Sequence, residues 1–305
     1  MLRRHGKAFV EATLVRGGVA ALARRVSTGA GIVLAYHNIV PEGAEPVGDR
    51  SLHLPVEEFR AQLDDLLDTH EVVPLDMVLW PDGRRARRPR IAITFDDAYR
   101  GAVTCGVAEL HARGLPATIF VSPAFVGGGS FWWDEVAAGA ASGELDEAFR
   151  GHALTELCGI DSDIRGWAAE KGIELKPVPE HARVATVEEL GRALQHPGLT
   201  LGSHSWSHPN LTRLASPALR AELERPLQWL QEHFERVRPW LSYPYGLSSP
   251  TVEAAAKGAG YSAGLLVCGG PVPRRNGSPY GVPRVNIPAG LSRNGFALRA
   301  AGLYE

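Results

Sequence analysis

The chain has 305 residues, 45% of them apolar, and a formal net charge of −2 at pH 7. This length and apolar content are enough for one large core, and the near-neutral charge gives no general reason to expect a nucleic-acid partner. Cys105, Cys158 and Cys268 are too widely spaced to indicate a disulfide framework or a thiolate zinc site. We therefore expect reduced cysteines and one main domain.

Residues 1–30 combine apolar residues at helical spacing with many basic ones. The apolar residues are Phe9, Val10, Leu14, Val15, Val19, Leu22 and Val26, and the basic ones are Arg3, Arg4, Lys7, Arg16, Arg24 and Arg25. The pattern predicts an amphipathic helical extension that either docks on the domain or makes a peripheral membrane contact. Its longest uncharged stretch, 17–23, is too short to span a membrane. We expect a cytoplasmic protein and leave membrane association open.

The rest of the chain alternates short β-rich runs with helical patterns. Eight runs are candidate strands: 31–37, 72–75, 90–97, 117–122, 199–203, 240–243, 263–267 and 282–287. Helices are expected at 56–69, 217–234 and 250–257, and the last two begin at a proline. This alternation predicts an α/β fold in which helices surround a parallel sheet, and eight strands favour a barrel.

One stretch, from about 127 to 198, fits the alternation poorly. It contains glycines, charges and scattered helical segments. We interpret it as a loop and helical insertion over one face of the barrel rather than as a second domain. The expected organisation is therefore an extension at 1–30 and a barrel at 31–305.

Acidic and histidine residues follow two of the predicted strands. Asp96 and Asp97 end the run IAITFDD, and His204 and His208 lie in HSWSH after LTLGS. One carboxylate and two imidazoles hold a divalent metal ion with open coordination positions, as water-activating centres require. The carboxyl ends of parallel barrel strands meet on one face. The sequence therefore predicts a metal-dependent hydrolase site, with the second aspartate free to move a proton.

These segments resemble a known family. TFDDAY, HSWSH and SYPYG are similar to the first three motifs of the polysaccharide deacetylases, also called the NodB homology domain or carbohydrate esterase family four. Further likeness lies in AYHNI, GLPATIFV, FWWDE and VPRVNI, so the resemblance extends over about 31–287. It implies a distorted (β/α) TIM-like barrel of seven or eight strands. It also implies a hydrolase that removes N-acetyl, or in some members O-acetyl, groups from an amino sugar or glycan.

The resemblance assigns a role to each motif residue. Asp97, His204 and His208 would hold the metal, with the two histidines on one face of a helical turn. Asp96 would be the general base, and a backbone N–H at Tyr245 would stabilise the oxyanion. Zinc suits these ligands best, and cobalt, nickel or manganese are also compatible.

Two departures from the family pattern affect the catalytic groups. Ser242 stands where many members have an arginine that orients the catalytic aspartate, and we predict that Arg284 in VPRVNI contacts Asp96 instead. The late histidine that many members use as general acid is also missing. His37 in AYHNI and a protonated Asp96 are alternative proton donors.

The substrate is a further expectation from the resemblance. Residues expected to bind it are Trp132, Trp133, Asp134, Tyr243 and Pro244. The SYPYG form resembles bacterial proteins of surface-polysaccharide biosynthesis, so the acetylated sugar can be polymeric, lipid-linked, nucleotide-linked or a small glycoside. A hydrolase of non-sugar amides and a catalytically impaired carbohydrate-binding relative are the alternatives. The sequence does not determine the oligomeric state.

Overall fold

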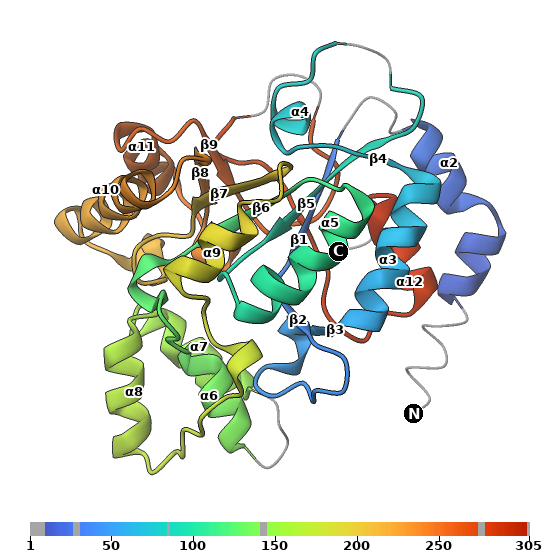
Figure 1. The fold of residues 1–305 in the computed structure, drawn as a ribbon. Coiled ribbons are helices and arrows are strands. Elements are labelled where there is room, and N and C mark those ends of the chain that lie inside the picture. The colour runs from blue at the N-terminus through green and yellow to red at the C-terminus, as the bar shows by residue number, and fades with distance from the viewer. Residues whose placement is uncertain (1–9, 27–30, 84–85, 141–144, 274–277, 304–305) are drawn as a thin grey trace.

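The computed structural model describes residues 10–26, 31–83, 86–140, 145–273 and 278–303, and a curled parallel β-sheet forms its centre (Figure 1). Its strands are β1 Ile32–Tyr36, β4 Glu71–Val72, β5 Arg90–Phe95, β6 Ala117–Val121, β7 Leu199–Ser203, β8 Val237–Ser242, β9 Ala263–Leu265 and β10 Val285–Asn286. The order is β10-β1-β5-β6-β7-β8-β9, and β4 pairs with the start of β5. Each of the eight predicted runs overlaps one of these strands, although β4 and β8 begin before the runs predicted for them.

The two ends of this seven-strand path approach one another through residues 282–286. Val282 forms a parallel bridge with Leu265 at the end of β9, and Val285 pairs with Leu34 of β1. One segment thus reaches from the last strand of the path to the first and curls the sheet into a distorted TIM-like barrel. The predicted fold class is confirmed. Strands such as β1 and β6 are buried along their whole length because helices cover the outside.

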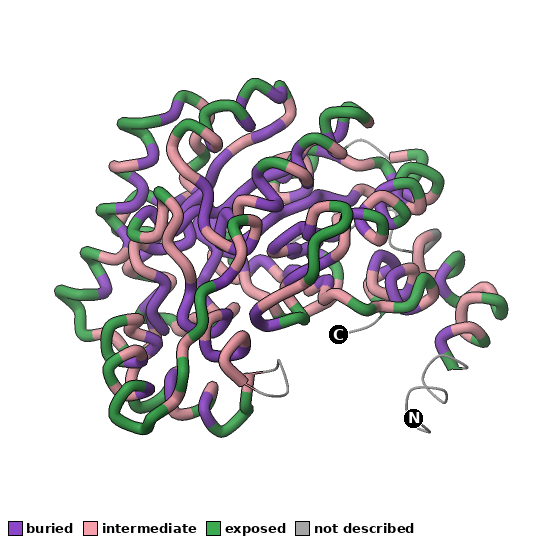
Figure 2. Tube along the Cα trace, turned by 60° about the horizontal axis from the view of Figure 1, so that its bottom comes forward, coloured by how far each residue is buried: buried purple, intermediate pink, exposed green. Residues whose placement is uncertain are grey.

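Helices surround the sheet (Figure 1). They are α3 Val56–Thr69, α4 Asp76–Leu79, α5 Val107–Arg113, α9 Val187–Ala193, α10 Ser216–His233, α11 Pro250–Gly258 and α12 Arg293–Ala300. The three predicted helices correspond to α3, α10 and α11. Single helical turns are η1 Arg50–Leu52, η2 Ala102–Gly106, η3 Pro123–Phe125, η4 Glu180–Ala182, η5 Leu211–Arg213 and η6 Pro244–Gly246. Figure 2 shows buried residues along the sheet and exposed ones on the outer helix faces.

The stretch expected to be an insertion contains three helices beside one end of the barrel: α6 Trp132–Gly139, α7 Glu147–Thr155 and α8 Asp161–Glu170 (Figure 1). Phe149 packs its ring against Trp132 and Trp167, so the helices share a core. Next to them lies a short parallel pair that the sequence analysis missed, β2 Asn38–Val40 and β3 His53–Pro55. The proposed domain boundaries stay a prediction.

The N-terminal segment is helical at residues 10–16 and in α2 Val19–Val26. Ala20 packs with Leu298 and Ala301, so this segment docks on the helix α12 region. Val10 and Leu22 are 52% and 63% exposed. Phe9, Arg3, Arg4 and Lys7, which belong to the predicted pattern, lie outside the described residues. Within the described ranges, no helix is long and apolar enough to cross a membrane.

Candidate active site

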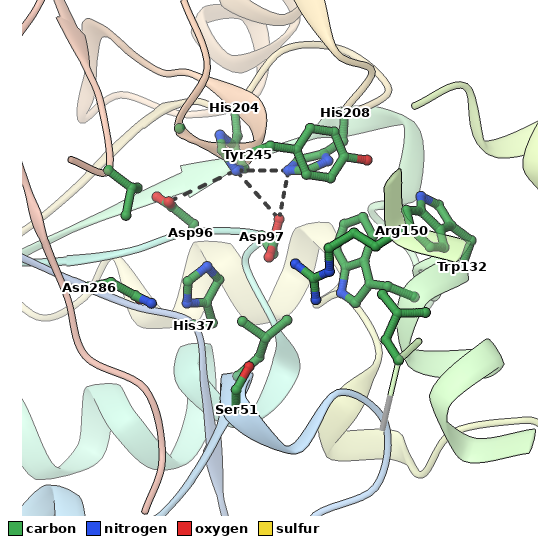
Figure 3. A pocket seen from close by; sticks show the side chains of 15 residues that line it. His37, Ser51, Asp96, Asp97, Trp132, Arg150, His204, His208, Tyr245 and Asn286 are labelled. Carbon is green, nitrogen blue, oxygen red and sulfur yellow. Dashed lines mark hydrogen bonds and ion pairs between the residues drawn. The ribbon is translucent and has the colours of Figure 1, made fainter. Parts of the chain in front are cut away.

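Asp96 and Asp97 lie where β5 ends. The Asp96 backbone N–H donates to Tyr36 O at 2.9 Å, which continues the sheet ladder by one residue. Asp97 and Ala98 then adopt left-handed backbone angles, with φ of 69° and 50°. Because the chain turns sharply there, both carboxylates line one cavity instead of alternating across the sheet (Figure 3).

His204 and His208 follow β7, and the expectation that they share a helical turn is wrong. Ser205 and His208 have φ of 64° and 58°, so the backbone between the histidines is not helical. The Ser205 hydroxyl accepts the His208 backbone N–H at 3.0 Å and closes the turn. This turn still brings the two Nε2 atoms to 3.1 Å from each other.

Asp97, His204 and His208 form a buried cluster suited to a metal ion. Asp97 Oδ1 lies 3.5 Å from His204 Nε2 and 3.4 Å from His208 Nε2. The His204 Nδ1–H donates to the backbone carbonyl of Ser242 at 2.7 Å, which leaves the Nε2 lone pair toward the cluster. Asp97 Oδ1 is buried and has no hydrogen-bond donor among the described residues. A cation between these three atoms would satisfy it.

The electrostatic environment matches this arrangement. Burial, together with the neighbouring charge of Asp96, raises the pKa of Asp97 well above its usual range. Burial lowers the pKa of His204 and, more strongly, that of His208. Neutral imidazoles are the form that binds divalent metals, and a cation at this site would restore the ionised form of Asp97, which burial otherwise disfavours.

Asp96 is held away from this cluster by Arg284. The guanidinium donates from Nη1 to Asp96 Oδ1 at 2.8 Å and from Nη2 to Oδ2 at 2.7 Å. Its other N–H groups donate to Thr94 Oγ1, Ser242 Oγ and Leu266 O. Burial by itself raises the pKa of Asp96, but the attraction of Arg284, assisted by the histidines, outweighs burial and holds this pKa well below its usual range. Asp96 is therefore ionised at neutral pH.

A cavity of about 190 Å³ opens over these groups (Figure 3). Of the residues predicted to act in the site, Asp96, Asp97, His204, His208, His37, Tyr245, Trp132 and Trp133 line it. The sequence analysis missed Ser51, Leu52, Leu145, Arg150, Gly246, Val267 and Asn286. Gly246 and Asn286 lie in the segments SYPYG and VPRVNI but were not expected to line the site. The others come from connecting segments and from the insertion, and no motif identified them.

His37 and Tyr245 line the cavity from different elements. His37 follows β1, and desolvation lowers its pKa to about 4, against the attraction of Asp96. Tyr245 lies in the turn η6 with a left-handed φ of 58°, and its ring centroid is 4.6 Å from that of His208. The turn after β8 thus places Tyr245 directly beside the candidate metal ligands.

Three residues that were expected to contact substrate do not line the cavity. Tyr243 is fully buried and donates its hydroxyl to Tyr280 O at 3.0 Å, and Pro244 next to it is also buried. Asp134 is fully buried behind the tryptophans. Direct substrate binding by Asp134, Tyr243 and Pro244 is therefore a wrong expectation, since none of them faces the cavity.

Asp134 instead connects the segments that support the tryptophan wall. Its carboxylate accepts the Tyr99 hydroxyl at 2.6 Å, the Asp49 backbone N–H at 2.9 Å and a contact from His53 Nε2 at 2.9 Å. Tyr99 in turn accepts the indole N–H of Trp133 at 3.0 Å. The acidic residue of FWWDE thus positions a cavity wall without contacting the cavity.

Comparison with known proteins agrees with this geometry. A family model described as polysaccharide deacetylase matches residues 83–264. The "Putative polysaccharide deacetylase YxkH" of Bacillus subtilis (strain 168) is 22% identical over 267 residues, which are 87% of this chain and 74% of that protein. The resemblance predicted from the motifs is confirmed.

Solved structures share the fold. The Streptococcus pyogenes deacetylase PplD in complex with acetate has a TM-score of 0.61 at 15% identity. The match covers 89% of this chain and 98% of the PplD chain. IcaB from Ammonifex degensii has a TM-score of 0.59 at 17% identity, over 91% and 98% of the two chains. At these identities the likeness concerns the fold alone. Because the family model spans more than half of the sequence, the chain belongs to the polysaccharide deacetylase family and is a hydrolase of the deacetylase class.

Proposed function

We propose that the protein is a metal-dependent deacetylase that hydrolyses the N-acetyl, or alternatively the O-acetyl, group of an acetylated amino sugar or glycan. The observation that carries this proposal is the different pairing of two adjacent carboxylates. Asp97 faces His204 and His208, whereas both oxygens of Asp96 are taken by Arg284. One carboxylate is thereby available to a metal ion and the other to a proton.

Asp97, His204 and His208 would hold the metal ion, and their buried, converging donor atoms support this assignment. Nitrogen and oxygen donors suit zinc, and also cobalt, nickel or manganese. A divalent ion bound there supplies a lowered pKa for a coordinated water and polarises the acyl oxygen.

Asp96 would accept the proton of the attacking water, because its low pKa keeps it ionised and Arg284 fixes its orientation. The backbone N–H of Tyr245 would stabilise the charge that develops on the acyl oxygen, since the left-handed turn fixes this residue beside the cavity. Desolvation keeps His37 neutral at pH 7. We therefore assign the return of the proton to Asp96 and a hydrogen bond to the leaving group to His37.

Trp132 and Trp133 would form the wall on which the sugar ring lies. Both line the cavity, and the Trp133 ring centroid is 4.9 Å from that of His208, so a ring stacked here is next to the metal ligands. The cavity of about 190 Å³ is smaller than the roughly 300–1,000 Å³ typical of drug-sized ligand sites. These dimensions favour a single sugar unit in the site.

The proposal also includes peripheral membrane contact by the N-terminal segment. Val10 and Leu22 are exposed on it, and Arg16, which lies between them in the sequence, is also exposed. Sedimentation with anionic vesicles tests this contact, and L22S is expected to weaken it. A cytoplasmic location stays a prediction.

Acetate release from the metal-loaded protein tests the proposed function. Acetylated glucosamine oligomers, small N-acetyl glycosides and simple N-acetyl alkylamines are compared. Release from the sugars alone supports the proposal, whereas equal release from the alkylamines favours a non-sugar amide hydrolase. Sugar binding without release favours an impaired carbohydrate-binding relative. D96N should lower kcat by about 10²–10⁴-fold, and D163N on helix α8 is the matched control.

A further inference from the structure

Arg150 on helix α7 is the sole lysine or arginine among the described residues that line the cavity. Its side chain is 41% exposed. Figure 3 shows its guanidinium group turned toward the same space as Asp97. Hydrolysis of a neutral acetamide needs no fixed positive charge at this wall, so the proposed chemistry leaves Arg150 without a role.

Asp49 orients this guanidinium. Arg150 Nη2 donates to Asp49 Oδ2 at 2.5 Å, and the Asp49 side chain is 11% exposed. The other oxygen of Asp49 accepts the Ser51 hydroxyl at 2.7 Å and the Ser51 backbone N–H at 3.2 Å. Within the described part of the chain the Arg150 side chain makes no further hydrogen bond. One edge of the guanidinium is thus fixed, and its other N–H groups stay available.

A purely structural role explains this arrangement poorly. The loop that carries Asp49 is already held by the bond from its backbone N–H to Asp134 and by the contacts to Ser51. A half-exposed ion pair contributes little to stability. An arginine that is oriented by a buried carboxylate is, by contrast, well prepared to bind a second anion through its planar fork.

The charges around the cavity leave room for that anion. Arg284 offsets the charge of Asp96, and Asp49 offsets that of Arg150. A divalent ion would more than offset the single charge of Asp97, so the cavity would carry a net positive charge. Arg150 and the metal ligands line one cavity of about 190 Å³. An anion bound to Arg150 must therefore belong to the same sugar unit as the acetamide, or be attached directly to it.

We propose that Arg150 determines specificity by binding an anionic group, a phosphate ester or a carboxylate, on the acetylated amino sugar. The inference rests on the proposed deacetylase function and names its substrate class. Its recognition element is an oriented guanidinium on the insertion, opposite the catalytic strand ends.

Kinetics with three probes test the proposal. N-acetylglucosamine 1-phosphate carries a phosphate, N-acetylmuramic acid carries a carboxylate, and methyl N-acetylglucosaminide is neutral. For the metal-loaded wild type, kcat/KM should be higher for at least one anionic probe than for the neutral one. R150Q should lower this anionic-to-neutral ratio by about 10- to 100-fold, mainly through KM, as expected for losing a charged hydrogen bond. R150K, which keeps the charge without the fork, should give an intermediate ratio.

R220Q is the charge-matched control, because Arg220 is 75% exposed on helix α10. It should leave the ratio unchanged. The anionic probe whose kinetics depend on Arg150 identifies the phosphate or the carboxylate as the recognised group. If R150Q lowers kcat/KM equally for all three probes, Arg150 only holds the loop. If the anionic-to-neutral ratio of kcat/KM is near one in the wild type, the protein does not recognise an anion. Either result overturns the inference.

Calorimetric binding separates failure of this inference from failure of the proposed function. The anionic probes are titrated into D96N and into D96N/R150Q. Weaker binding to the double variant supports anion recognition even if no acetate is ever released, in which case only the deacetylase function fails. Equal binding to both variants, with acetate released by the wild type, leaves the function intact and rejects the role of Arg150.

Discussion

Arg284 and Asp96 are joined by two parallel hydrogen bonds of 2.8 and 2.7 Å across 188 residues of sequence. Ser242 lies at the position where many family members have an arginine, and its hydroxyl accepts from Arg284 Nη2 at 2.7 Å. The small serine leaves space for a guanidinium that enters from the β10 side of the barrel. Asp96 is thus supported by a bidentate contact from the residue that precedes β10.

The first prediction concerns this pair. R284K keeps the charge but cannot make two parallel bonds to Asp96. We expect kcat to fall by about 10- to 100-fold with a smaller change in KM, since orientation of the base is lost. The pKa of Asp96 rises when Arg284 is weakened, so the acidic limb of the kcat/KM profile should move to higher pH. Metal content stays unchanged, and a loss of bound metal would instead assign Arg284 a structural role.

A second prediction separates the two aspartates by metal binding. D97N should lose most of the affinity for zinc, because Asp97 Oδ1 is the oxygen that faces both His204 and His208. D96N should retain zinc, because its carboxylate is directed to Arg284. Calorimetric titration of zinc into the apo forms measures both, and chelation should abolish acetate release in the wild type. Equal zinc affinity of the two variants would contradict the assignment.

The strands and the motif residues could be predicted because their signals are local. A parallel strand buried on both faces is a continuous apolar run, as in IAITF of β5, and a parallel sheet brings the strand ends together. The contact between Arg284 and Asp96 was predictable from one missing arginine. The two hydrogen bonds have ordinary lengths, and neither Arg284 nor Asp96 adopts a left-handed backbone angle.

What the sequence did not predict depends on contacts between distant segments. The left-handed angles of Ser205 and His208 are unfavourable locally, so spacing alone predicted a helical turn instead. Asp134 was expected to bind substrate because it follows the two tryptophans in the sequence. Its actual donors, Tyr99, His53 and the Asp49 backbone, come from three separate segments that the sequence does not bring together. Arg150 lies in the insertion but outside FWWDE and outside any other motif.

The third prediction concerns Asp134. D134N replaces one acceptor oxygen by a donor that faces other donors in a fully buried position. We expect a loss of about 2–4 kcal/mol in the free energy of unfolding, measured with urea, and a raised KM because Trp133 loses its support through Tyr99. Y99F removes a single bond from this network and should cost about 1 kcal/mol. If D134N were as stable as the wild type, the network would not position the wall.

The fourth prediction distinguishes the proton carriers. H37Q should reduce acetate release from an N-acetyl sugar by about 10-fold, as expected for one hydrogen bond to the leaving group. D96N should reduce it by about 10²–10⁴-fold. With 4-nitrophenyl acetate, whose leaving group needs no proton, H37Q should have little effect. A loss in H37Q as large as that in D96N, confined to the amide substrate, would make His37 the general acid.

The last prediction is a pH dependence of stability that arises outside the site. His70 ends helix α3 and is 3% exposed, and burial, followed by the charge of Arg24, lowers its pKa from 6.5 to about 4. The unfolded chain therefore binds one more proton than the folded chain between these values. The stabilisation is complete above pH 6.5 and is lost as the pH falls toward 4, by on the order of 3 kcal/mol. Urea unfolding at a series of pH values should show a shallower acid decline for H70Q than for the wild type. H233Q, at an exposed histidine of helix α10, should follow the wild type. If the free energy of unfolding of H70Q declined toward acid pH as steeply as that of the wild type, protonation of His70 would not destabilise the folded protein.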